Sequence, residues 1–224
     1  MDLLHLFGLW IGCMQISLIA LPLSLVQQWR KRRSSEGFSV VQMIIPIPIQ
    51  ICWLRYGWLT SDMLMVTTNS ILLTTSIVYF LLFCYYLPNK SSITHQVFIS
   101  TVVTFLLMIY VSNQSQNEKA TVMGKVAAFV QNTRIMGAFH QLKNIFDLKT
   151  TEFLPYQMPF VMFAFISQNA LYSFLAGKYP VVWASIPGLF FNTVFLIMYI
   201  MYPPKTWRVP ILGMGKKEAV TENK

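Results

Sequence analysis

Long apolar runs separated by short polar segments dominate the pattern along the chain. Four runs contain no charged residue, and two more contain only a histidine that could carry charge: 37–54, 63–89, 153–177 and 179–204, then 3–29 and 91–117. A seventh run, 122–146, is apolar except for Lys125, Arg134, His140 and Lys143. A helix crosses the hydrocarbon core of a bilayer with about 20 residues. The pattern therefore predicts an all-α membrane protein with seven transmembrane helices.

The composition agrees with this prediction. Only 11% of the 224 residues are charged, whereas a soluble domain carries roughly 25%. The first run begins after Asp2, is too long for a cleaved signal peptide and lacks a small-x-small cleavage site, so we expect it to remain as a helix. The three cysteines are scattered through predicted helices, which favours neither a disulfide framework nor a metal site. We expect no metal and no cofactor.

The net charge of +9 could suggest nucleic acid, but the positions of the cations indicate a membrane topology instead. Basic residues gather in alternate loops and in the tail: Arg30, Lys31, Arg32, Arg33, Lys90, Lys143, Lys149, Lys205, Arg208, Lys216, Lys217 and Lys224. Basic loops stay on the cytoplasmic side. We therefore predict a multi-pass protein with its N-terminus outside, its C-terminus cytoplasmic, the lipid bilayer as a partner and no nucleic acid. The plasma membrane is favoured, with the Golgi or another endomembrane left open.

An altered duplication runs through the chain. The RSSE of residues 33–36 returns as the KTTE of 149–152, and the aromatic Trp53 of W-x-x-Y-G returns as Tyr172 of Y-S-F-L-A. Two parallel three-helix copies need one extra crossing to restore their orientation, so helix four fits a linker in a 3+1+3 arrangement. The expected parts are a first repeat, a linker helix with its outer loop, a second repeat and a basic cytoplasmic tail: 1–89, 90–117, 118–204 and 205–224. Duplicated membrane units imply a site between them.

Several residues within the runs admit two interpretations. Pro22 kinks its helix, either as a static bend or as a hinge. Trp53 is either an interfacial anchor or a ligand residue. Asn69, in an apolar run, either ties two helices together or binds a ligand. Arg134 lies near mid-depth with no acidic residue in any predicted span, so it either binds backbone carbonyls and neighbouring amides or lines a pathway.

The order and spacing of these features over residues 5–204 resemble the SWEET sugar transporters, the MtN3/saliva type of PQ-loop uniporter. The elements that carry the resemblance are Pro22, the RSSE and KTTEFLP junctions, the W-L-R-Y-G segment with Asp62, and Asn69. The resemblance implies two parallel three-helix repeats with a sugar pocket midway between them. It also implies an asparagine from the third helix of each repeat and a residue, often Trp, from the second.

Carried onto this sequence, the implied pocket positions are Trp53 and Asn69 in the first repeat and Tyr172 and Gly188 in the second. The second repeat departs from the family, because Pro187-Gly188 stands where P-N is usual. Asn192, one turn deeper, is a candidate replacement. The resemblance further implies proline hinges, matched by Pro22 and Pro155 but replaced at Gln42 and Ala138.

The resemblance implies facilitative, bidirectional, low-affinity transport of a mono- or disaccharide by alternating access. No Asp or Glu lies in a predicted span, which favours transport that is not coupled to ions. The absence of G-x-S-x-G and H-E-x-x-H motifs disfavours an enzyme. A proton-coupled PQ-loop exporter of amino acids and a non-transporting degenerate paralogue are the alternatives, and a homo-oligomer is left open.

Overall fold

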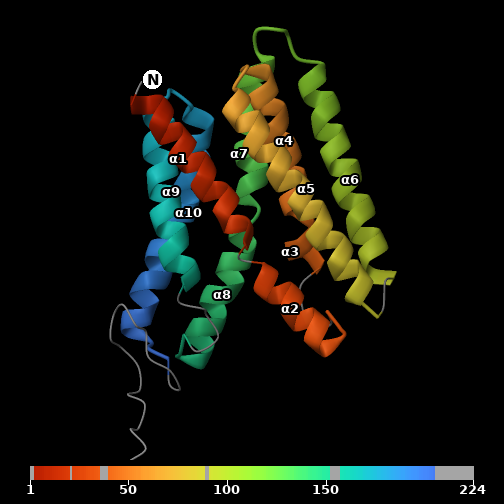
Figure 1. Cartoon of the computed structure of the whole chain (residues 1–224), viewed down its shortest axis with the longest axis vertical. Helices are drawn as coiled ribbons and strands as arrows, with labels where there is room; N and C mark the ends of the chain where they lie inside the picture. The colour runs from red at the N-terminus through yellow and green to blue at the C-terminus, as the bar shows by residue number, and fades with distance from the viewer. Residues whose placement is uncertain (1–2, 21, 36–39, 89–90, 152–156, 205–224) are drawn as a thin grey trace, which may run out of the picture.

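A computed structural model describes residues 3–20, 22–35, 40–88, 91–151 and 157–204. Within these ranges the regular structure is entirely helical (Figure 1). The elements are α1 (Leu3–Ser17), the 3-10 helix η1 (Leu18–Ala20), α2 (Leu23–Arg32), α3 (Val40–Ile44), α4 (Pro46–Leu59), α5 (Met63–Tyr86), α6 (Ser91–Ser112), α7 (Lys119–Asn132), α8 (Ile135–Leu148), α9 (Gln157–Leu175) and α10 (Tyr179–Met201).

Four helical stretches of the described chain are long and apolar enough to cross a bilayer: Leu3–Ala20, α5, α6 and α10. The apolar part of α9, Pro159–Leu175, is shorter. The other predicted spans are divided into shorter helices, α3 with α4 and α7 with α8, and the first span is interrupted before α2. The sequence pattern therefore located the helical regions, while the count of seven crossings stays a prediction.

The interruption of the first span lies at Pro22, where the helix loses a backbone donor. The Tyr79 hydroxyl of α5 donates to the Ile19 carbonyl at 2.7 Å, which satisfies a backbone group close to the break. The Val26 N–H bonds to the Pro22 carbonyl at 3.2 Å, so the helix resumes at once. An exposed carbonyl in lipid must find such a partner.

The α7–α8 interruption has no proline. Its two linking residues, Thr133 and Arg134, have αR backbone angles, and their N–H groups bond only three residues back, at 3.2 Å and 3.3 Å. This 3-10-type tightening separates α8 from α7, while the backbone N–H groups at the link remain hydrogen-bonded. Arg134 thus stands at the bend.

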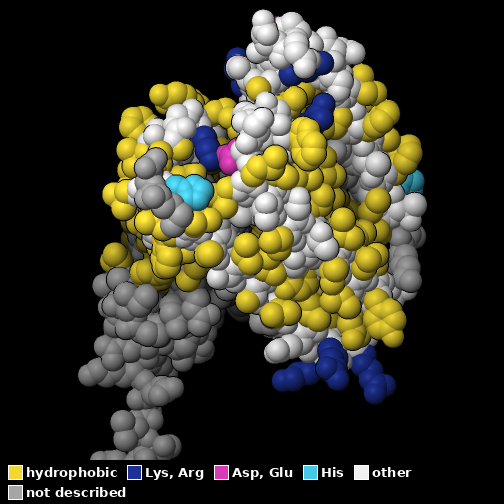
Figure 2. Space-filling model, turned by 45° about the horizontal axis from the view of Figure 1, so that its top comes forward, with side chains coloured by type: hydrophobic (Ala, Val, Ile, Leu, Met, Phe, Trp, Pro, Cys, Tyr) yellow, Lys and Arg dark blue, Asp and Glu magenta, His cyan; other side chains and the backbone are white. Residues whose placement is uncertain are grey.

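Packing brings elements from the beginning and the end of the chain together. α4 packs on both α5 and α7, α10 packs on both α9 and α7, and α1 meets both α5 and α9. Figure 1 shows α6 at one edge of the bundle, away from α9 and α10. Large apolar side chains of α6, such as Phe98 and Phe105, are exposed. The surface view in Figure 2 shows hydrophobic side chains over most of the visible flank, with Lys and Arg at both its upper and its lower end.

Several local features recur 116 positions later. Helices α2 and α8 both end in a left-handed residue, Arg33 (φ 51°) and Lys149 (φ 48°). Two residues on, the N–H groups of Ser35 and Thr151 each bond, at 3.0 Å, to the carbonyl at the end of a long helix, α5 in one case and α10 in the other. Both side chains are fully buried. Residues 33–35 and 149–151 therefore form the same junction twice.

The turns at the opposite end of the bundle match in the same way. Ser61 (φ 55°) precedes α5, and Gly177 (φ 69°) precedes α10. In each turn the following N–H bonds to the carbonyl five residues earlier, at 2.9 Å for Asp62 and 2.7 Å for Lys178. The described parts of the two halves thus share one register.

This register corrects one sequence-based pairing. The matched turns place Tyr172 opposite Tyr56, and they place Asn169, not Tyr172, opposite Trp53. The sequence comparison had aligned aromatic with aromatic and so shifted the second copy by three residues. Backbone hydrogen bonds at a turn fix the register more securely than side-chain likeness does.

Candidate substrate cavity

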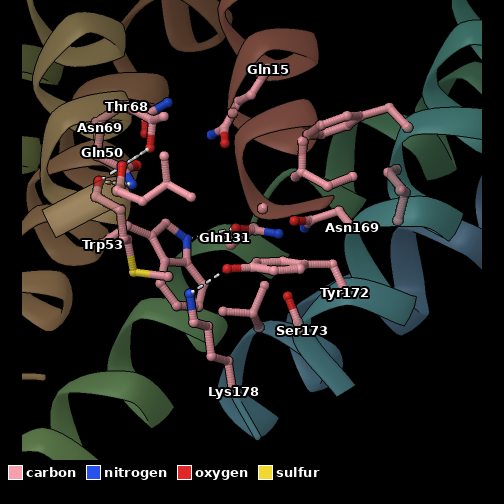
Figure 3. A pocket seen from close by; sticks show the side chains of 18 of the residues that line it. Gln15, Gln50, Trp53, Thr68, Asn69, Gln131, Asn169, Tyr172, Ser173 and Lys178 are labelled. Atoms are coloured by element: carbon pink, nitrogen blue, oxygen red, sulfur yellow. Dashed lines mark hydrogen bonds between the residues drawn. The ribbon is translucent and has the colours of Figure 1, made fainter. Parts of the chain in front are cut away.

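A cavity of about 210 Å³ lies among α1, α4, α5, α7 and α9 and the first residues of α8 and α10. Trp53, Asn69, Tyr172 and Arg134, which the sequence had singled out, all line it. Figure 3 shows that most of the other labelled side chains are polar and converge from helices on opposite sides of the space. Pockets for drug-sized ligands span about 300–1,000 Å³. This cavity therefore suits a smaller, polar molecule.

Trp53 is buried, with 6% of its surface exposed. Its Nε1–H donates to Gln131 Oε1 at 2.6 Å, and its ring meets Tyr56 edge-on at 5.7 Å. The Gln131 amide nitrogen in turn donates to the Ala184 carbonyl at 3.4 Å. This polar chain links α4, α7 and α10, so the indole N–H is committed to the protein.

Asn69 is also buried, at 5% exposure, and its Nδ2 donates to the Met65 carbonyl at 2.8 Å, one turn back in α5. Its Oδ1 has no hydrogen-bond partner among the described residues. The side chain is thereby held in one orientation with an acceptor to spare. Such an amide can accept a hydrogen bond from a ligand hydroxyl.

Tyr172 reaches into the cavity from α9 (Figure 3). Lys178 Nζ donates to its hydroxyl at 3.2 Å, and Phe7 packs against the ring edge-on at 5.8 Å. Gly8 of α1 leaves room for the ring, since a Cβ there would lie 2.7 Å from the hydroxyl oxygen. The ring is positioned from three directions.

Lys178 and Asp62 form an ion pair at the end of the cavity where α5 and α10 begin. Asp62 also caps α5, because its Oδ1 accepts from the Met65 N–H at 3.1 Å. Burial lowers the pKa of Lys178, but the hydrogen bond and attraction to Asp62, with a smaller contribution from Tyr172, outweigh it, and the net pKa is raised. Lys178 therefore stays charged, and the pair ties the two halves together.

Three further amides line the cavity and were not singled out from the sequence: Gln15 of α1, Gln50 of α4 and Asn169 of α9. None of them has a hydrogen-bond partner within the described part of the chain. A signal was present, because a carboxamide inside an apolar span must bond to a neighbouring helix or to a ligand. The sequence could not distinguish these two outcomes.

Gly188 and Asn192 lie outside the cavity lining. Asn192 Nδ2 donates to the Gly188 carbonyl at 2.7 Å, so that amide is used within α10. A Cβ on Gly188 would lie 3.1 Å from Ile166 Cδ1, so the space an asparagine would need is taken by α9. The second half instead presents an amide to the cavity from α9, as Asn169.

Of the two expected hinges, only Pro22 lies within the described residues. Pro22 stands at the N-terminal end of α2, where the first span is interrupted. Pro155 lies outside the described residues.

Comparisons with known proteins agree with this arrangement. A profile of the family described as "Sugar efflux transporter for intercellular exchange" matches residues 5–91. Bidirectional sugar transporter SWEET10 of Arabidopsis thaliana is 22% identical over 77% of this chain, and Sugar transporter SWEET1 of Drosophila pseudoobscura pseudoobscura is 23% identical over 85% of it. The matches cover 61% of the plant protein and 84% of the fly protein. The chain thus spans about three fifths of that plant relative.

The structure of a eukaryotic SWEET transporter superposes with a TM-score of 0.75, at 19% identity, over 89% of this chain and 96% of the other. The class defined by fold and cavity is therefore a multi-pass helical membrane protein with a polar chamber between packed helices. Within that class, the chain is similar to the SWEET transporters.

Proposed function

We propose that this protein carries a sugar across a membrane by facilitated, bidirectional, low-affinity diffusion, as a transporter rather than an enzyme. The observation that supports this most is the cavity lining, in which Gln15, Gln50 and Asn169 offer unpaired amides beside three aromatic side chains. A sugar presents hydroxyls that both donate and accept, and faces of C–H groups that pack on aromatic rings. Two relatives, from Arabidopsis thaliana and Drosophila pseudoobscura pseudoobscura, are named as sugar transporters, which also supports this proposal.

The architecture we propose is two parallel three-helix repeats joined by α6 (3+1+3), with the sugar held between them. The first repeat spans 1–89, the linker 90–117, the second repeat 118–204 and the tail 205–224. The recurrence of junctions and turns 116 positions apart supports this division. In this proposal α1 with α2, α3 with α4 and α7 with α8 each form one interrupted crossing.

The mechanism we propose is alternating access. The Asp62–Lys178 pair closes the cavity at the outer end, and Pro22 and Pro155 act as hinges toward the cytoplasmic end. The concentration of Lys and Arg in alternate loops and in the tail supports a cytoplasmic placement of those segments under the positive-inside rule. We place the N-terminus outside and the C-terminus in the cytoplasm, in the plasma membrane.

The cavity size favours a monosaccharide over a disaccharide in this conformation. The lining contains no Asp or Glu, which supports uncoupled transport over a proton-coupled exporter of amino acids. An amino acid's ammonium group would also meet the uncompensated cation Arg134 there. An intact amide-lined cavity disfavours a non-transporting paralogue.

The test is radiolabelled glucose flux in proteoliposomes that contain the purified full chain. We expect saturable flux in both directions that persists when the pH gradient is abolished. Asn69→Ala should raise the half-saturating concentration, while Ser167→Ala, on α9 outside the cavity, serves as the control. Flux that disappears without a pH gradient would favour the proton-coupled alternative, and flux no greater than in empty vesicles would contradict the proposal.

A further inference from the structure

The charge balance of the cavity is unusual for a site that holds only neutral sugars. Its lining contains two cations, Arg134 and Lys178, and no acidic side chain. Lys178 is already neutralised by Asp62. The Arg134 side chain is exposed, lines the cavity, and has neither an ion pair nor a hydrogen bond among the described residues. One positive charge therefore faces the ligand without compensation.

The position of Arg134 makes a lipid headgroup a poor partner for it. The residue lies at the bend, about midway between the start of α7 at Lys119 and the end of α8 at Leu148. Each half of that path is roughly 20 Å long at 1.5 Å per residue, too far for a side chain to reach either membrane surface. A cation at mid-depth that cannot reach lipid phosphate requires an anion or a water-filled pathway.

The rest of the cavity is built for hydroxyl groups. Gln131, one turn before Arg134, is held by Trp53 and Ala184, while Gln15 and Asn169 keep free amides. A ligand that satisfies both parts has several hydroxyls and one negative charge. A guanidinium binds a carboxylate through two parallel N–H···O bonds. A phosphate monoester, with about −1.5 to −2 charges, would exceed the single uncompensated cation.

We propose that the cavity accepts singly charged sugar acids, hexuronates or aldonates, in addition to neutral hexoses, and that Arg134 binds their carboxylate. This inference rests on the transport function proposed above, because it assigns a second substrate class to the same path. The polyol part occupies the amide side of the cavity, and the carboxylate points toward the α7–α8 bend.

The experiment measures influx of radiolabelled glucuronate and glucose, side by side, into proteoliposomes with the full chain. The variants are Arg134→Gln, Arg134→Lys and the control Lys143→Gln, an exposed cation on α8 outside the cavity. We expect saturable glucuronate influx in the unaltered protein. Arg134→Gln should lower the ratio of glucuronate to glucose flux at least about tenfold, since a charge-assisted pair contributes about 1.5–3 kcal/mol. Arg134→Lys should retain much of the ratio, and Lys143→Gln should retain all of it.

Two readouts on the unaltered protein keep the test independent of how well a variant folds. Glucuronate should compete with glucose influx. An imposed inside-positive potential should also increase the final accumulation of glucuronate but not of glucose, because equilibrium accumulation depends only on the net charge moved per cycle.

Glucose flux without glucuronate flux would overturn this inference and leave the proposed function standing. A ratio that Arg134→Gln does not change, or glucuronate accumulation that ignores the potential, would also overturn it. Glucuronate flux without glucose flux would support the inference and contradict transport of neutral sugars. No flux of either would overturn both.

Discussion

Tyr56, in the half of the chain before α6, packs beside Gly124 of the later half, and Tyr172, in the later half, packs beside Gly8 of the earlier one. The two tyrosines are 116 positions apart, and so are the two glycines. Each half therefore offers a tyrosine from one helix to a glycine on the partner half's first helix. Two copies of one unit that face each other across an approximate twofold axis would make this reciprocal contact.

The halves differ at the next matched positions. Trp53 bonds to Gln131 across the interface, but the matched pair, Asn169 and Gln15, makes no hydrogen bond among the described residues. One side of the cavity is thus fixed by a polar bridge, and the other presents two free amides (Figure 3). A duplicated frame can thus divide its tasks between its two matched contacts, because one contact joins the halves by a hydrogen bond and the other leaves its amides free.

The largest expected effect is at Gly8 and Gly124, because these two glycines make the matched contacts between the halves. A Cβ at Gly124 would lie 2.6 Å from Pro180 Cγ and 3.0 Å from the Tyr56 ring. A proline ring cannot rotate away, and overpacking costs about 1–3 kcal/mol. Gly124→Ala should lower the thermal unfolding midpoint in detergent and reduce glucose flux at least about fivefold.

Gly8→Ala is the matched comparison, because its close contacts all belong to the Tyr172 side chain, which can move into the cavity. We expect a smaller loss of stability there and a higher half-saturating concentration for glucose. Equal loss of stability in the two variants would contradict the idea that the cavity gives one side more freedom.

The second prediction separates the role of the Trp53–Gln131 hydrogen bond from that of the unpaired amide Asn169. Trp53→Phe leaves Gln131 Oε1 without its donor, and an unsatisfied buried group costs about 1–3 kcal/mol. That variant should lose stability. Asn169→Ala should retain stability but weaken glucose half-saturation by ~2- to 13-fold, the range of one net hydrogen bond.

Thermal unfolding and concentration-dependent flux, measured on both variants, check this division, with Ser167→Ala as a control on α9. If Asn169→Ala lost stability and Trp53→Phe lost only affinity, the assignment of tasks to the two sides would be reversed.

The sequence predicted much of this frame but little of the division of tasks. Apolar runs located every described helical region, because exclusion of charge is the main requirement of a bilayer. Pro22 marked one interruption. The bend at Thr133 and Arg134 had no such mark, since it depends on two residues that bond three positions back.

At the cavity, the sequence pointed to Trp53, Asn69, Tyr172 and Arg134 but passed over Gln15, Gln50 and Asn169. An amide in an apolar span is equally consistent with a helix–helix tie, and only the arrangement in space shows which amides are unpaired. Asn169 was also hidden by the three-residue shift of the aromatic alignment.

The third prediction concerns the Asp62–Lys178 ion pair where α5 and α10 begin, which joins unlike residues at matched positions. Asp62→Asn keeps an oxygen to cap α5 but removes the charge that attracts Lys178. We expect glucose exchange to fall at least about twofold, as a coupling of about 0.5–3 kcal/mol between contacting residues implies.

The charge-reversed double variant, Asp62→Lys with Lys178→Asp, should recover part of the lost exchange. A double variant no better than the worse single variant would show that the pair does not act as a unit.

The smallest expected effect is at Asn192. It tests whether the second half supplies its cavity amide from α9, as Asn169, and not from α10. Asn192 donates within α10 and does not line the cavity, so Asn192→Ala should change glucose half-saturation by less than about twofold. Gly188→Asn should not improve half-saturation, because the new side chain meets Ile166 before it reaches the ligand. Combining Gly188→Asn with Ile166→Ala supplies the missing space. If that double variant rescued Asn169→Ala, either α9 or α10 could supply the amide, and only the space left by Ile166 would decide between them.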